Sequence, residues 1–288
     1  MDILLIISVI PSLVLGGYIY KKDSIEKEDS KLLFLLFLFG FLSLFAAAFI
    51  ENTIDIFIPS FYDQSDIIMT FIGSFLGIGL VEEILKWIVL RIFTWKHSDF
   101  NHIYDAIVYA VFVSLGFATI ENVLYVTQNG ILTGLVRMIA SVPGHVFFGV
   151  FMGYYYGMAK KAFMNNRKDL ERKNMLLSII IPICLHGFFD FCLLAQSYLA
   201  LLVYLFFLII LYIMAFKKVK QLSSVSLMLD NLPYNPTIHE VNAPVVQVMV
   251  PSTNTLNQES SVVTSSYCPH CGKPAVGNFC PHCGKPLH

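Results

Sequence analysis

Long apolar stretches separated by short polar ones organise most of this chain. Stretches of roughly 20 residues, the length needed to cross about 30 Å of hydrocarbon, occur seven times. They lie at 3–20, 32–50, 67–95, 103–126, 131–159, 175–195 and 199–216, and the third and fifth are longer than one crossing requires. The pattern predicts an all-α polytopic membrane protein with about seven transmembrane helices.

Composition supports a membrane protein. Hydrophobic residues make up 56% of the 288 residues and charged residues only 14%, whereas soluble domains have about 25% charged residues. The net charge is −1, so the chain offers no basic surface for nucleic acid. The partner that this composition indicates is the lipid bilayer.

Lys and Arg are concentrated in alternate loops. The loops at 21–31, 96–102, 160–174 and 217–220 hold four, one, six and three of them, and the intervening loops hold none. By the positive-inside rule, the N-terminus is expected outside the cell membrane and the C-terminus in the cytoplasm. The first apolar stretch has no basic residue before it, which is typical of a retained anchor. Only Arg137 departs from the charge pattern.

The composition changes after Phe216. The segment 217–266 is rich in Ser, Asn, Pro and Val without sustained periodicity, which predicts a flexible cytoplasmic linker. We therefore divide the chain into a membrane core at 1–216, this linker, and a small C-terminal module at 267–288.

The C-terminal module contains the heptapeptide CPHCGKP twice, at 268–274 and 280–286. Two Cys-x-x-Cys pairs at this spacing predict a zinc ribbon with a structural tetrahedral zinc site, whose ligands are Cys268, Cys271, Cys280 and Cys283. The alternative is two disulfides, which a reducing cytoplasm disfavours. Four thiolates leave no open coordination position, so we expect this module to recognise a protein partner or mediate self-association.

Ionisable residues inside the apolar stretches are the candidates for chemistry. Each charged group costs roughly 2.5 to 3.5 kcal/mol at the centre of a membrane helix, so such groups usually face partners inside the protein. They are Glu82, Glu83 and Lys86 in the third stretch, Glu121 and Asn122 in the fourth, His145 in the fifth, and His186 and Asp190 in the sixth. Topology places Glu82, Glu83, Glu121, His145 and Asp190 at or outside the membrane midplane, so we expect these groups to converge on a cavity open to the exterior.

Two spacings indicate how these helices pack. His186 and Asp190 are four residues apart and so share a helix face. Gly149, Gly153 and Gly157 recur at intervals of four after His145, a stripe of small residues that lets helix backbones approach closely.

Four motifs carry a resemblance to a known family. VEEILK at 81–86, FATIEN at 117–122, PGHVFFG at 143–149 and LHGFFD at 185–190 resemble, in order and spacing, the motifs of the PrsW family of intramembrane proteases, which is related to the CAAX-processing proteases. Asp105, Tyr125 and Arg137 also fit that pattern. The resemblance covers about residues 67–195 and implies hydrolysis of a peptide bond in a membrane-protein substrate, such as an anti-sigma factor. It does not extend to the zinc ribbon.

The residue types suit amide hydrolysis. We expect Glu82 or Glu83 to be the general base and the other glutamate, with Glu121, to orient it, the water or a metal. His145 and His186 would donate to the oxyanion, with Asp190 setting the tautomer of His186. Lys86, Asn122 and Phe117 would support the site. The same Glu and His side chains could instead bind a catalytic divalent metal. We favour the metal-free version, although no spacing decides between them.

Two other functions fit the composition. Buried Glu, His and Asp side chains also form relays in transporters and proton-coupled channels. An inactive membrane receptor that recruits partners through the ribbon would keep every motif residue. The ordered match of four motifs favours the protease over both.

Overall fold

The computed structural model describes residues 2–23, 27–223, 266–267 and 274–275. The chain forms two compact units, Met1–Asn235 and Pro236–His288. Within the described residues, every helix belongs to the first unit.

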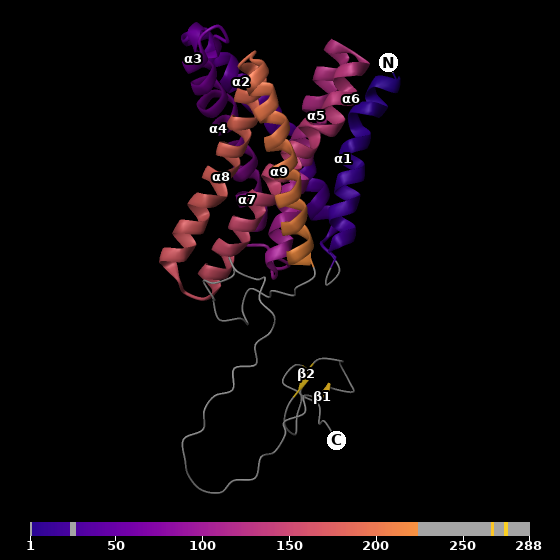
Figure 1. Cartoon of the computed structure of the whole chain (residues 1–288). Helices are drawn as coiled ribbons and strands as arrows, with labels where there is room; N and C mark the ends of the chain where they lie inside the picture. The colour runs from indigo at the N-terminus through magenta and orange to yellow at the C-terminus, as the bar shows by residue number, and fades with distance from the viewer. Residues whose placement is uncertain (1, 24–26, 224–265, 268–273, 276–288) are drawn as a thin grey trace, which may run out of the picture. The chain divides into compact units, whose positions relative to one another are not determined.

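The first unit is a bundle of helices (Figure 1). Within the described residues, its α-helices are α1 (Asp2–Lys22), α2 (Ser30–Phe57), α3 (Ile67–Ile72), α4 (Leu80–Thr94), α5 (Ile103–Asn129), α6 (Ile131–Ile139), α7 (Ser141–Met164), α8 (Lys168–Leu194) and α9 (Tyr198–Ser223). A 3-10 turn, η1 (Pro59–Tyr62), precedes α3, and a π-helical segment, η2 (Gly73–Gly79), joins α3 to α4.

Seven helical spans in the described part of the chain are long and apolar enough to cross a membrane, as the sequence predicted. The two overlong stretches are composite: one runs through α3, η2 and α4, and the other through α6 and α7. The last helix continues to Ser223, beyond the predicted end of the core at residue 216. No Pro or Gly follows Phe216 before Ser223, and lysine is a good helix former, so nothing stops the helix earlier.

Helices α5 and α7 form the centre of the bundle. In the most apolar window of α5, 89% of the residues are buried, against 17% in that of α9, which lies at the periphery. The glycine stripe brings the two central helices together: a Cβ at Gly153 would lie 2.4 Å from the carbonyl oxygen of Ala106, and one at Gly149 would lie 2.7 Å from Ser114 Oγ. The prediction of close backbone packing along this stripe is confirmed.

A break at Ala140 separates α6 from α7 and has a local cause. Pro143 lies in the first turn of α7, where its missing N–H is tolerated, and its ring disfavours a continuous helix through Ile139. The Ile139 carbonyl therefore lacks its usual donor four residues on. The Tyr212 hydroxyl of α9 donates to it instead.

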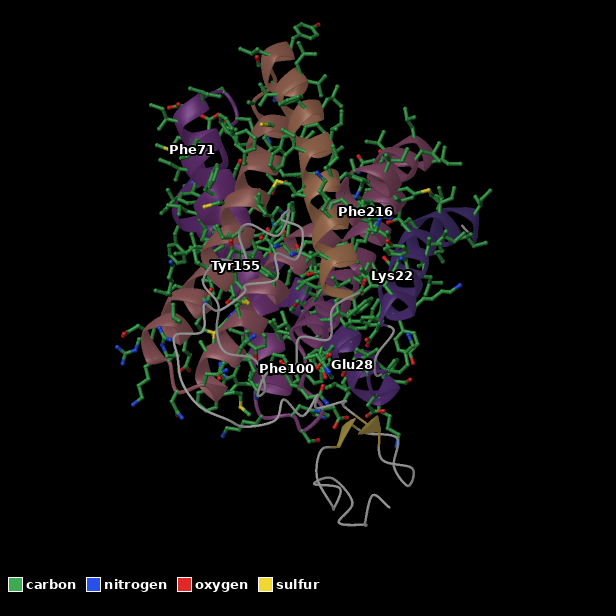
Figure 2. The ribbon with its side chains drawn as sticks, turned by 60° about the horizontal axis from the view of Figure 1, so that its bottom comes forward. Lys22, Glu28, Phe71, Phe100, Tyr155 and Phe216 are labelled. Atoms are coloured by element: carbon green, nitrogen blue, oxygen red, sulfur yellow. The ribbon has the colours of Figure 1, made fainter. Side chains whose placement is uncertain are left out.

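Asp105 lies at the opposite end of α5 from Glu121, about 24 Å away at 1.5 Å rise per residue. Its carboxylate accepts from the backbone N–H groups of Asn101 and His102 and caps the helix. Asp105 therefore lies outside the site, although it fits the family pattern. Tyr109, one turn further along α5, donates to Glu28 and packs on Phe100, and Figure 2 shows Glu28 and Phe100 at this end of the bundle.

The second unit contributes a short antiparallel pair, β1 (Ser266–Tyr267) with β2 (Pro274–Ala275). These strands flank the first Cys-x-x-Cys in sequence. The four predicted zinc ligands lie outside the described residues, so the zinc ribbon stays a prediction.

Candidate active site

The π-helical segment η2 brings the start of α4 against α8. A Cβ at Gly79 would lie 3.0 Å from the backbone nitrogen of Gly187, and a Cβ at Gly187 would lie 2.7 Å from the Phe75 ring. Only glycine allows the two backbones to approach this closely. Because Gly187 directly follows His186, this contact places His186 beside the two glutamates of α4. Segments of π-helix often occur at functional sites, and this one positions the candidate base.

Lys86 is the charged centre of the site. Its Nζ lies 2.8 Å from Glu83 Oε1, 3.0 Å from Glu82 Oε2 and 3.2 Å from His145 Nδ1, and the side chain is fully buried. The Phe117 ring lies beneath the ammonium, with its centroid 3.9 Å from Nζ. Contacts to three polar partners and one aromatic face compensate for the burial of this charge.

His145 bridges α7 to Glu121 of α5. An ammonium group can only donate, so Nδ1 of His145 accepts from Lys86 and Nε2 carries the proton. Nε2 then donates to Glu121 Oε2 at 2.8 Å. His186 instead lies between two carboxylates, because its Nδ1 is 2.9 Å from Glu83 Oε1 and its Nε2 is 3.3 Å from Asp190 Oδ2, so both ring nitrogens face acceptors. Each imidazole therefore turns one nitrogen to the centre and the other to a carboxylate.

Arg137 holds Glu121 from the far side. Its guanidinium lies 2.8 Å from Glu121 Oε2, and its Nε donates to Asn122 Oδ1 at 3.1 Å. Asn122 in turn donates to the Ser8 carbonyl of α1. Tyr125 stacks on the guanidinium at 4.1 Å. Asn122, Arg137 and Tyr125 thus brace Glu121, which contacts His145 and not the glutamate pair of α4.

A cavity of about 610 Å³ leads to this cluster. Glu82, Glu121, His145, His186 and Asp190 line its floor, whereas Glu83 and Lys86 lie behind that lining. The other wall is apolar and comes mainly from α6, the end of α8, and α9. The structure thus brings the six predicted catalytic residues into one constellation, and five of them face the cavity.

Sequence reasoning missed Glu51. It lies near the end of α2, lines the same cavity, and its Oε1 is buried without a hydrogen-bond partner in the described part of the chain. The predicted helix stopped at residue 50, so Glu51 was placed in the following loop. Its signal was the sequence AAAFIENTIDIF, in which apolar residues continue beyond the glutamate.

The donor set fits a divalent metal. One atom each from Glu82, Glu83, His145 and His186 lies within 4.8 Å of the others, and all four residues are buried. Glu83 Oε2 is buried and has no hydrogen-bond partner among the described residues. Carboxylate and imidazole ligands suit zinc and related transition metals, and the outward carboxylates on both imidazoles are typical partners of ligating histidines. Lys86 Nζ lies among three of these donors, so it would have to move for a metal to bind there.

One expected role does not match the geometry. The histidines were expected to donate to the oxyanion, but all four imidazole nitrogens contact other groups of the cluster. This arrangement favours holding the centre together over direct contact with the substrate.

Comparisons with known proteins identify the family. The model of the PrsW family of intramembrane metalloproteases matches residues 28–215. A protein named Protease PrsW from Geobacillus kaustophilus is 37% identical over 217 residues, which cover 74% of this chain and 89% of that relative. The proteins of the same name from Bacillus subtilis and Clostridioides difficile are each 34% identical to this chain. The matched regions cover 95% and 87% of those two relatives. No solved structure matches.

These findings confirm the predicted family, the all-α membrane fold and the assignment as a peptidase. The family description also weakens our preference for a metal-free mechanism. The residues of the predicted zinc ribbon lie beyond the matched range. With about two thirds of its length matched, including every residue of the buried Glu and His cluster, the chain belongs to the PrsW family of intramembrane proteases.

Proposed function

We propose that this protease hydrolyses a peptide bond of a membrane-protein substrate at the cluster of Glu82, Glu83, His145 and His186. One observation carries the proposal: both histidines hold one nitrogen at the glutamate and lysine centre and the other on a carboxylate. Both imidazoles are thus fixed in orientation, and they lie beside a cavity large enough for a peptide. A preorganised hydrolytic site requires this arrangement.

Glu82 is the better candidate for the general base. It lines the cavity, whereas Glu83 is fully buried behind it. A water in the cavity can therefore reach Glu82, which takes its proton during attack on the carbonyl and can return it to the leaving amine. Glu83 instead holds Lys86 and His186 in place through its Oε1.

Glu83 and the inward nitrogens of His145 and His186 are the residues that would hold a metal, with Glu82 beside them. A divalent metal would supply Lewis-acid activation of water and of the carbonyl. Glu121 and Asp190 orient the two imidazoles, and Arg137 keeps Glu121 in position.

Two further parts of the proposal rest on the sequence. The alternation of positive loops places the cavity toward the outer side of the membrane. The family resemblance suggests an anti-sigma-factor-like protein as the substrate, cut near that surface.

The test uses the full chain in lipid vesicles with a set of single-span peptides, and mass spectrometry identifies the products. We expect the wild type to cleave and Glu82→Gln and Glu83→Gln to lose cleavage by at least a hundredfold. Chelation should lower activity, and added Zn²⁺ or Mn²⁺ should restore it. Wild-type rates in both Gln variants would overturn the assignment of the two glutamates, whereas no cleavage by the wild type would support an inactive receptor or a transporter.

We also propose that the cysteines of the repeated heptapeptide bind one structural zinc and serve recognition or self-association. The domain boundary is better drawn after Ser223, where α9 ends. Elemental analysis of the full chain and of a chain ending at Ser223 tests this. Loss of about one zinc with a folded membrane core supports the two-module arrangement. An unchanged metal content contradicts it.

A further inference from the structure

Glu51 is an acid of the cavity that the proposed chemistry does not use. It lies near the end of α2 and lines the cavity wall. Its Oε1 is buried, and no hydrogen bond reaches that oxygen within the described residues. A buried carboxylate oxygen without a donor is unfavourable. In a cavity that admits a substrate, the missing donor is one that the substrate can carry.

The other three carboxylates that line the cavity each contact a basic side chain, at 2.8 to 3.3 Å. The pairs are Glu82 with Lys86, Glu121 with Arg137, and Asp190 with His186. No ion pair reaches Glu51 in the part of the chain that the structure describes. The donor atoms that could hold a metal come from other residues, so a metal bound there would leave Glu51 without a partner as well. The cavity wall thus has one carboxylate in excess of its bases.

Packing of α2 holds this carboxylate beside the catalytic cluster. Ala47 and Ile54 lie four residues before and three residues after Glu51, so the three share one face of the helix. Ala47 and Ile54 belong to a hydrophobic cluster with Val81, the residue before Glu82. The face of α2 that bears Glu51 is therefore fixed against the start of α4, where the proposed base lies.

We propose that Glu51 is a specificity-determining residue that binds a lysine or arginine side chain of the substrate near the scissile bond. This inference rests on the proposed function, because it names the substrate class of the same site. The substrate is then a membrane protein with a basic residue close to its cleavage site, and Glu51 is the acceptor for that residue.

The chemistry of the cavity suits such a side chain. An ammonium or guanidinium group only donates hydrogen bonds, and an ionised carboxylate only accepts them. Much of the remaining lining is apolar, which suits the alkyl stem of lysine or arginine. A cavity of about 610 Å³ is roughly 10 Å across, a distance that about three extended residues span. A basic residue within about three positions of the cut can therefore reach Glu51 while the peptide bond lies at Glu82.

Paired peptides test the inference with the full chain in phosphatidylcholine vesicles, whose lipids carry no net charge. Each single-span peptide has a core of Leu and Ala, capped ends and uncharged polar flanks. One position, moved stepwise through three residues on either side of the cut, holds Lys or norleucine, which has the same carbon stem without the ammonium. Energy transfer between the labelled N-terminus of the chain and a dye on the peptide gives the affinity. Mass spectrometry gives KM and kcat.

Two variants change Glu51 and one changes its neighbour. Glu51→Gln keeps the shape and removes the charge, whereas Glu51→Lys reverses the charge. Asp55→Asn is the matched control, because it removes a carboxylate one turn further along α2 at an exposed position that does not line the cavity.

We expect wild type and Asp55→Asn to bind the best Lys peptide at least tenfold more tightly than its norleucine partner. KM should be lower in the same ratio, with kcat within twofold. The preference should fall below twofold in Glu51→Gln, and Glu51→Lys should prefer a peptide with Glu at that position. Thermal unfolding identifies a misfolded variant, and the other Glu51 variant then decides.

Equal affinity of wild type for the Lys and norleucine peptides at every position overturns the proposal, and so does a Lys preference that persists in Glu51→Gln. Cleavage without a Lys preference would leave the proposed hydrolysis intact. Binding of the Lys peptide that depends on Glu51, without cleavage of any peptide by the wild type, would refute the hydrolysis and keep the role of Glu51.

Discussion

His186 and Asp190 form a pair across one turn of α8, with His186 Nε2 at 3.3 Å from Asp190 Oδ2. The other imidazole nitrogen lies 2.9 Å from Glu83 Oε1 of α4. His145 lies between the Lys86 ammonium and the Glu121 carboxylate. The two histidines differ in their inner partner but each has a carboxylate on its outer nitrogen, which indicates that the outward carboxylates serve to orient the rings.

Replacing Asp190 by asparagine tests this orienting role. The amide keeps the shape but loses the charge that holds His186, so we expect the cleavage rate to fall about 10- to 100-fold with little change in unfolding temperature. Metal affinity, measured by competition with a chromogenic chelator, should fall with it. Asp55→Asn, at an exposed position of α2, is the control and should leave both unchanged. A variant with full activity would show that Asp190 has no part in the site.

Lys86→Met removes the ammonium between the two glutamates. The variant leaves buried carboxylates without their cation, which costs about 3–5 kcal/mol in comparable buried pairs. In chelator we therefore expect a large drop in the unfolding temperature. Added Zn²⁺ should raise the unfolding temperature of the variant by more than it raises that of the wild type, because the ammonium no longer lies among the metal ligands. Lys31→Met, at an exposed position, serves as the control. Equal stability of Lys86→Met and wild type would show that the ammonium does not hold the site.

Gly153→Ala tests the contact between α5 and α7. The added Cβ would lie 2.4 Å from the Ala106 carbonyl oxygen, so the two backbones must separate. We expect a loss of about 1–3 kcal/mol or more, read from denaturation in detergent. A Cβ at Gly17 would meet nothing within 4 Å, so Gly17→Ala should keep or slightly raise stability. Similar results for both variants would contradict the close packing of the central helices.

Much of the fold could be predicted because hydrophobic length alone determines membrane spans. The seven spans and the shared face of His186 and Asp190 follow from length and period. The break at Ala140 and the π-helical segment were not predicted. Proline is an ambiguous signal, because Pro11 and Pro182 lie inside unbroken helices while Pro143 follows a break. The approach of Gly79 to Gly187 joins residues far apart in sequence and has no local signal.

The sequence predicted which residues form the site, but not which of their side chains contact one another. Charge in an apolar stretch identified Glu82 and His145, whereas the contact of His145 with Lys86 joins residues 59 positions apart and has no local signal. Glu51 was missed because an acidic residue at the end of an apolar run resembles the start of a loop. Only the cavity, which it shares with the other acids, reveals it.

The Glu28 carboxyl, in the segment between α1 and α2, predicts a pH dependence of stability. Burial, together with the nearby Asp105 and Asp23 carboxylates, raises its pKa to about 9, against the bond donated by Tyr109. Its ordinary value is 4.5, so the folded protein binds a proton that the unfolded chain releases. Stability from this group is complete below about pH 4.5 and is lost as pH rises toward 9.

The difference between wild type and Glu28→Gln isolates this effect from other titrations. Glutamine mimics the protonated carboxyl. We therefore expect the unfolding temperature of the variant to decrease less than that of the wild type between pH 6 and pH 9. Asp29→Asn, at the exposed neighbouring position, should follow the wild type. The measurement is thermal unfolding in one detergent across that pH range. If wild type and Glu28→Gln lose stability in parallel, Glu28 is already ionised in the folded protein, and the Tyr109 hydroxyl then donates to a buried carboxylate.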